Sequence, residues 1–375
     1  MSRFTDFESV AQAGVRALTP YLPGKPLSEL EREFGITDAV KLASNENPLG
    51  ISAKARAAVE RAVGDLARYP DGGCFEIKAA LAKRLGVAAE QITLGNGSND
   101  VLDLIARVFA GPGDEVIFSE HAFAVYPIAT QAVGATAVVT PAKDWGHDLA
   151  AMLAAITPRT RLIFIANPNN PTGTWLKSDE LQAFIQQVPE RIPVVVDEAY
   201  FEYARYPAMG AADYPDALAW VERHPNLIVA RTFSKAYGLA GLRLGYSVAH
   251  RTIAGLINRV RQPFNVNSLA QVAALAVLGD ADYLQQGLML NAAGMQQLTR
   301  GFEALGLDYI PSIGNFVCVD VGRPGVEVYN ALLREGVIVR PVANYGMPRH
   351  LRVSIGLERE NARFLAALGK VLAAC

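Results

Sequence analysis

The sequence predicts an α/β fold in which a mostly parallel β-sheet lies between helices and is followed by a smaller α+β region. Short, continuously apolar segments alternate with segments of helical periodicity through the middle of the chain. Such apolar segments are typical of parallel strands that are buried on both faces. Beyond Pro263 the alternation gives way to two long helical segments and then to three short strand-like segments.

The predicted elements of the sheet region follow in chain order. Ile77, Leu81 and Leu85 recur at four-residue spacing, which predicts an amphipathic helix over residues 75–85. Residues 91–94 predict a short strand, and residues 101–109 predict a helix with apolar residues on most of its faces. Four further strands are predicted at residues 115–118, 161–166, 194–196 and 227–230.

The second region is predicted from a change of pattern near residue 270. It has helices at residues 270–278 and 283–305, and strands at residues 316–321, 337–340 and 351–355. We therefore expect a large domain over residues 45–270 and a small domain made of residues 1–44 and 271–375. The N-terminal arm packs either on the small domain or on a partner subunit, and the sequence leaves both alternatives open.

Composition and charge exclude several classes of protein. Of the 375 residues, 51% are hydrophobic and 19% are charged, and the formal net charge is −2, which is typical of a globular protein with a large core. This balance predicts neither nucleic-acid nor membrane-surface binding. No apolar run reaches the ~18 residues of a membrane span, and the N-terminus lacks the apolar core of a signal peptide. The three separated cysteines and the histidine spacing predict no metal site, and we expect a cytoplasmic location.

Lys235 is the first candidate for chemistry. It lies in the segment Thr-Phe-Ser-Lys-Ala-Tyr-Gly at residues 232–238, between apolar and glycine-rich surroundings. An ammonium group is costly to desolvate there without a partner. A lysine in such a place can lose its proton and form a Schiff base with a carbonyl compound. The alternative is a structural lysine whose charged end reaches solvent from a strand-to-helix turn.

Polar residues follow three of the predicted strands, at the edge of an open sheet where ligands bind. Gly-Asn-Gly-Ser-Asn-Asp at residues 95–100 enters a helix and could hold an anion, or could be an ordinary helix cap. Asn170 lies in a proline-rich turn that could aim its amide at a ligand. Asp197 directly follows an apolar strand, which predicts either a buried acid that meets a cation or a helix cap.

The set of residues is more specific than its members. Lys235, Asp197, Asn170 and Tyr200 are what a pyridoxal phosphate site needs, because the lysine holds the aldehyde and a carboxylate keeps the pyridine nitrogen protonated. The amide and the phenol can donate hydrogen bonds to the phenolate oxygen of the ring. Four further residues would contact the cofactor phosphate, namely Ser98, Asn99, Ser234 and Arg243.

Three segments resemble the fold-type I aminotransferases: Asn-Pro-Asn-Asn-Pro-Thr-Gly at 167–173, Asp-Glu-Ala-Tyr at 197–200 and Ser-Lys-Ala-Tyr-Gly-Leu-Ala-Gly-Leu-Arg at 234–243. Within this family the sequence is most similar to the histidinol-phosphate aminotransferases. That narrower resemblance rests on residues 18–21, 41–50 and 68–71, which read Leu-Thr-Pro-Tyr, Lys-Leu-Ala-Ser-Asn-Glu-Asn-Pro-Leu-Gly and Arg-Tyr-Pro-Asp. The resemblance extends from Val15 to the C-terminal region.

The resemblance implies a fold-type I transferase with pyridoxal 5'-phosphate as cofactor and a role for each matching residue. The catalytic residues would be Lys235, Asp197 and Tyr200. Phe123 would stack on the cofactor ring, and Tyr69 would reach the cofactor phosphate of the neighbouring subunit, which implies a homodimer. Arg352 would hold the anionic end of the substrate. The other expected substrate contacts are Arg340, Tyr21, Asn45 and Asn315.

The implied reaction is transamination of L-histidinol phosphate with 2-oxoglutarate, which gives imidazole acetol phosphate and glutamate in histidine biosynthesis. An aromatic amino-acid aminotransferase is the nearest alternative, because imidazole and phenyl groups need similar pockets. A decarboxylase of a phosphorylated amino acid is a second alternative, since it could share the cofactor residues. A regulatory module that senses the cofactor is a third, but the N-terminal residues show no basic helix-turn-helix pattern.

Overall fold

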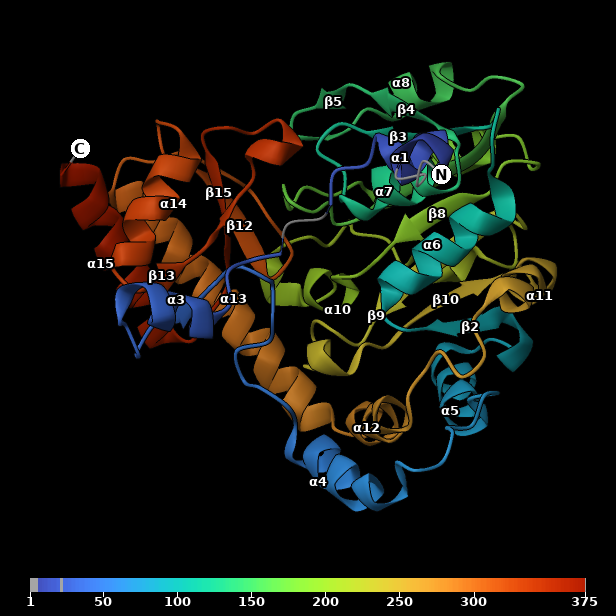
Figure 1. The fold of residues 1–375 in the computed structure, drawn as a ribbon, viewed down its shortest axis with the longest axis horizontal. Helices are drawn as coiled ribbons and strands as arrows, with labels where there is room; N and C mark the ends of the chain where they lie inside the picture. Colours follow the sequence, from blue (N-terminus) through green and yellow to red (C-terminus); the bar gives the residue numbers. More distant parts are fainter. Residues whose placement is uncertain (1–5, 21–22, 375) are drawn as a thin grey trace, which may run out of the picture.

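The structure, a computed structural model, describes residues 6–20 and 23–374. Figure 1 shows two regions, one built on a seven-stranded sheet and the other on a four-stranded sheet. The long helix α13 (Ala281–Ala304) runs obliquely from the smaller region toward α12 (Ser268–Leu278) below the larger sheet. Within the described residues, no helix is both long and apolar enough to cross a membrane.

The larger sheet has the strand order β2-β10-β9-β8-β7-β3-β4. Its strands are β2 (Ile92–Gly95), β3 (Glu115–Ser119), β4 (Thr136–Thr140), β7 (Thr160–Ala166), β8 (Val194–Asp197), β9 (Leu227–Thr232) and β10 (Gly245–Ala249). The pairs from β4 to β9 are parallel, whereas β10 is antiparallel to both β2 and β9. The expected mostly parallel sheet between helices is therefore confirmed, but the sequence reading did not identify β4 or β10.

Helices cover both faces of this sheet, as alternation along β7 shows. Ile163 and Ile165 contribute to the core shared with α5 (Phe75–Leu85), α8 (Leu149–Ala154), α9 (Ser178–Gln187) and α12. Leu162 and Phe164 contribute to the opposite core, with α6 (Ser98–Phe109), α7 (Val125–Ala132) and α11 (Arg251–Val260). Successive side chains of a strand point to opposite faces, so a strand between two helical layers must be apolar throughout. This explains the continuous apolar runs in the sequence.

The smaller sheet has the order β11-β12-β15-β14, with bounds β11 (Tyr309–Ile310), β12 (Phe316–Asp320), β14 (Arg340–Pro341) and β15 (His350–Ser354). Its core, which contains Val317, Val353 and Phe302, is covered by α13, α14 (Gly325–Arg334) and α15 (Glu358–Ala374). The prediction of a single strand at residues 337–340 is wrong. Two short strands stand there, because β13 (Val337–Ile338) pairs with β1 (Val40–Lys41), whereas β14 pairs with β15.

Residues 27–41 of the N-terminal arm pack on this smaller region, since Leu30 shares a core with Leu333 and Ile338. The earlier helices α1 (Phe7–Val10) and α2 (Ala13–Arg16) lie near α7 instead. The other helices are α3 (Leu27–Phe34), α4 (Ala53–Ala62) and α10 (Phe201–Ala204), and a hairpin joins β5 (Ala142–Lys143) to β6 (Gly146–His147). Short 3-10 helices occupy Val63–Asp65, Ala89–Gln91, Pro207–Met209, Ala217–Trp220, Ala240–Leu242 and Ala343–Tyr345.

Candidate active site

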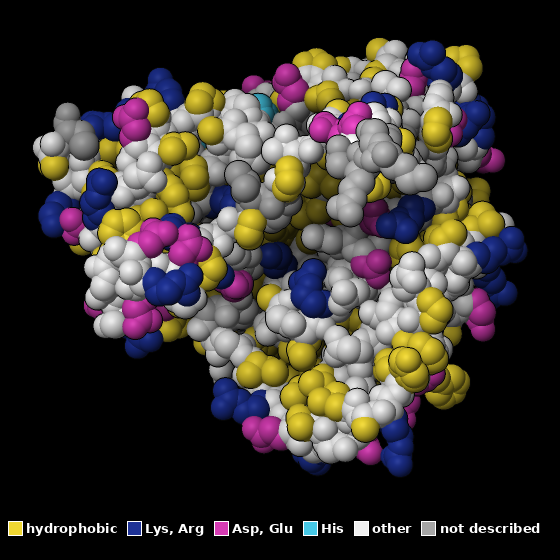
Figure 2. All heavy atoms as spheres, viewed as in Figure 1, with side chains coloured by type: hydrophobic (Ala, Val, Ile, Leu, Met, Phe, Trp, Pro, Cys, Tyr) yellow, Lys and Arg dark blue, Asp and Glu magenta, His cyan; other side chains and the backbone are white. Residues whose placement is uncertain are grey.

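A cavity of about 180 Å³ lies at the carboxyl ends of β7 and β8, where polar loops follow the buried strands. Figure 2 shows that one face of the molecule is hollowed between the two sheet regions, with Lys and Arg side chains in and around the hollow. The cavity is lined by most of the residues expected from the sequence: Asn45, Ser98, Asn99, Phe123, Asn170, Asp197, Tyr200, Ser234, Lys235, Arg243, Arg340 and Arg352. Segments from both regions therefore meet at one place.

Lys235 lies in the loop after β9, and its ammonium nitrogen donates a hydrogen bond to the backbone oxygen of Ser44 at 3.0 Å. Burial lowers the pKa of Lys235 to about 7, and the nearby guanidinium of Arg352 acts in the same direction. A large fraction of this amine is thus neutral near pH 7, which is the form that attacks a carbonyl group.

Asp197 ends β8 and is 4% exposed. Its Oδ2 atom accepts a hydrogen bond from the hydroxyl of Tyr126 at 3.0 Å, whereas its Oδ1 atom is buried and has no hydrogen-bond partner among the described residues. Burial raises the pKa of Asp197 to about 6. A buried carboxylate oxygen without a partner is costly, so the site is built for a donor that the described residues do not supply. A protonated ring nitrogen fits this position.

Two amides converge on the hydroxyl of Tyr200. The Nδ2 atom of Asn45 donates to it at 2.9 Å, and the Nδ2 atom of Asn170 donates to it at 3.1 Å. Burial raises the pKa of Tyr200 to about 12, so the phenol keeps its proton. Because the oxygen already accepts two hydrogen bonds, its own hydrogen is available for an acceptor in the cavity.

Arg352 brings a buried positive charge to the cavity wall. Arg352 is 7% exposed. Its guanidinium donates to Oδ1 of Asn170 and to the backbone oxygen of Ala43, both at 2.6 Å. Among the described residues no carboxylate forms an ion pair with it, and its Nε atom has no hydrogen-bond partner. Arg340 lies directly opposite Arg352 in the neighbouring strand and also lines the cavity. Two adjacent guanidinium groups favour an anionic ligand.

A second anion position lies at the start of α6. Gly97 precedes the helix with φ +86°, and a Cβ atom built there would stand 2.4 Å from Nη2 of Arg243. Arg243 itself has φ +59°, and its Nη1 atom lies 3.5 Å from the hydroxyl oxygen of Ser234. Free helix amides and a guanidinium thus face the same corner as Ser98 and Asn99, a combination that suits a phosphate group.

Phe123 lies on the cavity wall and contacts the aromatic group that supports Asp197. Its ring meets the ring of Tyr126 edge to face at 5.9 Å, and Tyr126 stacks on Phe164 at 4.7 Å. Sequence reasoning did not identify Tyr126, although it lies three residues after Phe123. The signal that could have found it is its position on the inner face of a helix above the sheet.

Of the expected residues that the structure describes, two do not line this cavity. Tyr69 is 82% exposed and stacks on Phe264, with ring centroids 4.6 Å apart. Asn315 lies behind the wall, where its Nδ2 atom donates to the backbone oxygen of Asn45 at 2.9 Å. Tyr21 lies outside the described residues.

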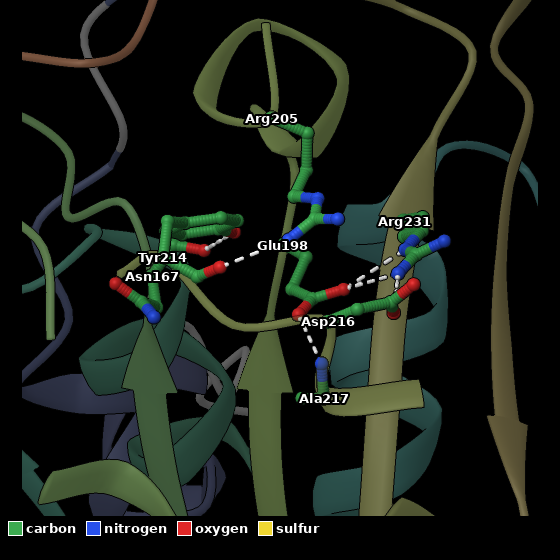
Figure 3. A network of polar contacts seen from close by, with 7 residues as sticks. All are labelled: Asn167, Glu198, Arg205, Tyr214, Asp216, Ala217 and Arg231. Carbon is green, nitrogen blue, oxygen red and sulfur yellow. Dashed lines mark hydrogen bonds and ion pairs between the residues drawn. The ribbon is translucent and has the colours of Figure 1, made fainter. Parts of the chain in front are cut away.

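On the other face of the sheet a buried ion-pair network joins the strands that carry Asp197 and Lys235 (Figure 3). Glu198 is 0% exposed, and its Oε2 atom accepts two hydrogen bonds from Arg231 of β9, at 2.9 and 2.7 Å. Asp216 binds the same guanidinium at 2.7 Å. Sequence reasoning missed this network, because nothing local indicates that Glu198 and Arg231 share a face.

The same network reaches the strand that leads to Asn170. The hydroxyl of Tyr214 donates to the backbone oxygen of Asn167 at 2.6 Å, and Arg205 donates to the backbone oxygen of Tyr214 at 3.2 Å. Figure 3 shows these side chains gathered at and just beyond the ends of neighbouring strands. The loops that build the cavity are thus held from behind by buried polar contacts.

Comparison with known proteins agrees with this geometry. Residues 37–368 match the family model Aminotransferase class I and II. Histidinol-phosphate aminotransferase 2 of Pseudomonas aeruginosa is 62% identical over 371 residues, covering 98% of this chain and 99% of that protein. The protein of the same name from Pseudomonas fluorescens is 61% identical, with the same coverage. The crystal structure of histidinol-phosphate aminotransferase from Sinorhizobium meliloti, in complex with pyridoxal-5'-phosphate, superposes with a TM-score of 0.89 at 31% identity, covering 100% of this chain and 99% of that chain.

Proposed function

The chain belongs to the class I and II aminotransferase family, and from this premise we propose that it transfers an amino group from L-histidinol phosphate to 2-oxoglutarate with pyridoxal 5'-phosphate as cofactor. The products are imidazole acetol phosphate and glutamate, and the reaction belongs to histidine biosynthesis. One observation carries the proposal. A lysine whose pKa is lowered to about 7, a buried carboxylate with an unpartnered oxygen and a pair of facing arginines line one cavity.

Bound pyridoxal phosphate supplies an aldehyde that condenses with amines and a protonated ring that withdraws electrons. Asp197 would accept the ring N–H at Oδ1, the atom that otherwise lacks a partner. Tyr200 and Asn170 would donate to the phenolate oxygen, and Phe123 would stack on the ring. The phosphate would be held at the start of α6 by Ser98, Asn99, Ser234 and Arg243.

Lys235 would both hold the cofactor and move the proton. Because a large fraction of its amine is neutral near pH 7, it can take the α-proton of the substrate at Nζ and return a proton to the cofactor side. Its hydrogen bond to the backbone oxygen of Ser44 keeps the amine at the cavity wall.

Arg352 and Arg340 would bind the anionic end of each substrate in turn. Histidinol phosphate presents a phosphate, and 2-oxoglutarate presents carboxylates. A guanidinium group matches both anions with paired N–H donors, so one arginine pair can serve both half-reactions. Asn45 would complete the substrate side of the cavity, with Asn315 behind it, and Tyr21 stays a predicted substrate contact.

We include a homodimer in the proposal. Tyr69 and Phe264 form an exposed aromatic pair away from the cavity of their own subunit, as expected if Tyr69 serves the cofactor phosphate of a partner. The division into a large domain (45–270) and a small domain (1–44 and 271–375) is also part of this proposal, as is a cytoplasmic location. Sedimentation at low protein concentration and cell fractionation would check the dimer and the location.

The decisive experiment follows both half-reactions by absorbance. Adding histidinol phosphate to the holoenzyme should remove the visible cofactor band, and adding 2-oxoglutarate should restore it with formation of glutamate. Lys235→Ala should lower turnover by a factor of about 10³ or more, while cofactor still binds non-covalently. Faster turnover of phenylalanine in the same assay would favour the aromatic alternative, and release of carbon dioxide without use of 2-oxoglutarate would indicate a decarboxylase.

A further inference from the structure

Asn45 is held by three other side chains although it lies in a loop. Its backbone N–H donates to the hydroxyl oxygen of Ser354 at 2.7 Å, and its Oδ1 atom accepts from the same hydroxyl at 2.8 Å. Its backbone oxygen accepts from Asn315 at 2.9 Å, and its Nδ2 atom donates to Tyr200 at 2.9 Å. The residue is 1% exposed and has φ +54°. Every polar group of Asn45 therefore has a partner.

Ser354 decides which way the amide of Asn45 points. A hydroxyl has one hydrogen and two lone pairs, and one lone pair of Ser354 already receives the backbone N–H of Asn45. The hydrogen goes to Oδ1, so the amide presents its N–H₂ group to Tyr200. If the amide were reversed, its N–H₂ group would face the Ser354 hydroxyl, and the hydroxyl hydrogen would lose Oδ1 as its acceptor.

The orientation of this amide sets the role of the Tyr200 hydroxyl. Its oxygen accepts from Asn45 and from Asn170, so its own hydrogen is left for a third partner. Donors on the oxygen also polarise the O–H bond and strengthen the hydrogen bond that it donates, by about 10–30% for each such bond.

We propose that Ser354 is a positioning residue for the reaction: through Asn45 it turns the hydroxyl of Tyr200 into a donor toward the phenolate oxygen of the cofactor. The inference rests on the proposed function only in that pyridoxal phosphate binds at Lys235. Ser354 lies two residues after Arg352 in β15, so the strand that carries the anion-binding arginine also orients Tyr200. Ser354 is itself 3% exposed and is not among the described residues that line the cavity, which it reaches through Asn45.

The test is a pH titration of the visible band of the holoenzyme, with Ser354→Ala compared with the unchanged chain. The phenolate oxygen of the cofactor carries most negative charge after the lysine-bound nitrogen has lost its proton. A weaker hydrogen bond from Tyr200 to that oxygen therefore disfavours the deprotonated form. We expect the midpoint of the band change to move up by about half a pH unit, a factor of about three in the equilibrium constant. Ser354→Thr keeps the hydroxyl and should return the midpoint toward its original value.

Two controls separate positioning from a general loss of structure. Ser247→Ala removes another buried strand hydroxyl, 1% exposed and in β10, and should leave the midpoint unchanged. Tyr200→Phe should raise the midpoint further than Ser354→Ala, and adding Ser354→Ala to it should produce no additional shift. An unchanged midpoint in Ser354→Ala, or an equal shift on the Tyr200→Phe background, overturns the proposal. Failure of the proposed substrate leaves this readout intact, because the titration uses no substrate.

Discussion

Arg340 and Arg352 lie directly opposite each other in the antiparallel pair of β14 and β15. Like charges in that position destabilise a strand pair unless an anion lies between them. Both arginines line the cavity, and Arg352 donates a hydrogen bond to the amide oxygen of Asn170. The arginine pair is therefore the feature that connects the cavity to an anionic substrate.

Replacing Arg352 with lysine should weaken binding of both anions. The charge remains, but the paired donors of the guanidinium are lost, and hydrogen bonds to charged groups contribute about 1.5–3 kcal/mol. We expect KM to rise about 10- to 100-fold for both histidinol phosphate and 2-oxoglutarate in steady-state assays. Arg363→Lys, which changes an arginine paired with Asp38 at the surface, is the matched control. A rise for only one of the two substrates would show that the anions bind at different places.

The reactivity of Lys235 should depend on pH through Arg352. The pKa of Lys235 is lowered to about 7 by burial first and by the Arg352 charge second. In the apoprotein, reductive methylation of Lys235 should therefore have its midpoint near pH 7, whereas an ordinary lysine titrates near ~10.4. Arg352→Gln should move the midpoint upward, as followed by mass spectrometry of the peptide. A midpoint that stays in place would exclude the electrostatic contribution of Arg352.

Asp197→Asn should change how the stability of the apoprotein depends on pH. Burial raises the pKa of Asp197 to about 6, so the folded state binds a proton more tightly than the unfolded state does. The unchanged protein consequently loses stability as pH rises from about 4, the usual value for Asp, to about 6. The side chain of the variant does not ionise. As pH rises over that window, the free energy of unfolding of the variant should therefore increase, relative to that of the unchanged protein, by up to about 3 kcal/mol.

Denaturant unfolding at pH 4 and pH 7 measures this difference, and Asp280→Asn provides a control of opposite sign. Asp280 accepts hydrogen bonds from Ser52 and Lys54, which lower its pKa. Its stabilising contribution is present above the usual pKa and is lost as pH falls, so Asp280→Asn should lose relative stability as pH rises. Parallel behaviour of the two variants would contradict the assignment for Asp197.

Gly97→Ala should weaken cofactor binding specifically. The new methyl group would stand 2.4 Å from Arg243 Nη2 and displace the guanidinium from the start of α6. We expect the affinity for pyridoxal phosphate to fall about 10-fold or more, as measured by fluorescence titration of the apoprotein. Gly113 also has a positive φ, at +91°, but has no heavy atom within 4 Å of a built Cβ. Gly113→Ala should therefore strain the backbone without changing cofactor affinity, and equal losses in both variants would contradict the phosphate position.

Glu198→Ala should destabilise the fold strongly. Its removal leaves Arg231, which is 4% exposed, with only Asp216 as an ion-pair partner among the described residues. Breaking a buried pair costs about 3–5 kcal/mol. Glu335→Ala breaks the exposed ion pair with Lys370 and should cost less than about 1 kcal/mol in the same denaturant unfolding assay. Similar losses in both variants would show that the buried network contributes no more than a surface pair.

Local sequence was sufficient for much of the fold because buried parallel strands and amphipathic helices have distinct periodicities. The helix at Phe75–Leu85 and the strands at β3, β7, β8 and β9 follow the expected ranges within a few residues. The antiparallel β10 could not be assigned in the same way, since it is as buried as its parallel neighbours and its direction depends on how the chain returns to the sheet.

The sequence by itself determined a mostly parallel α/β region and the residues that gather at its strand ends, because the carboxyl ends of parallel strands meet at one edge of a sheet. Only the tertiary structure decided which distant groups complete them. The hydroxyl of Tyr126 that meets Asp197, and the Ser354 side chain 309 positions from Asn45, come from separate elements. These contacts depend on packing between elements, on which local periodicity carries no information. Lys235 could therefore be found from its neighbours in the chain, whereas the hydrogen bonds that orient Tyr200 required the fold.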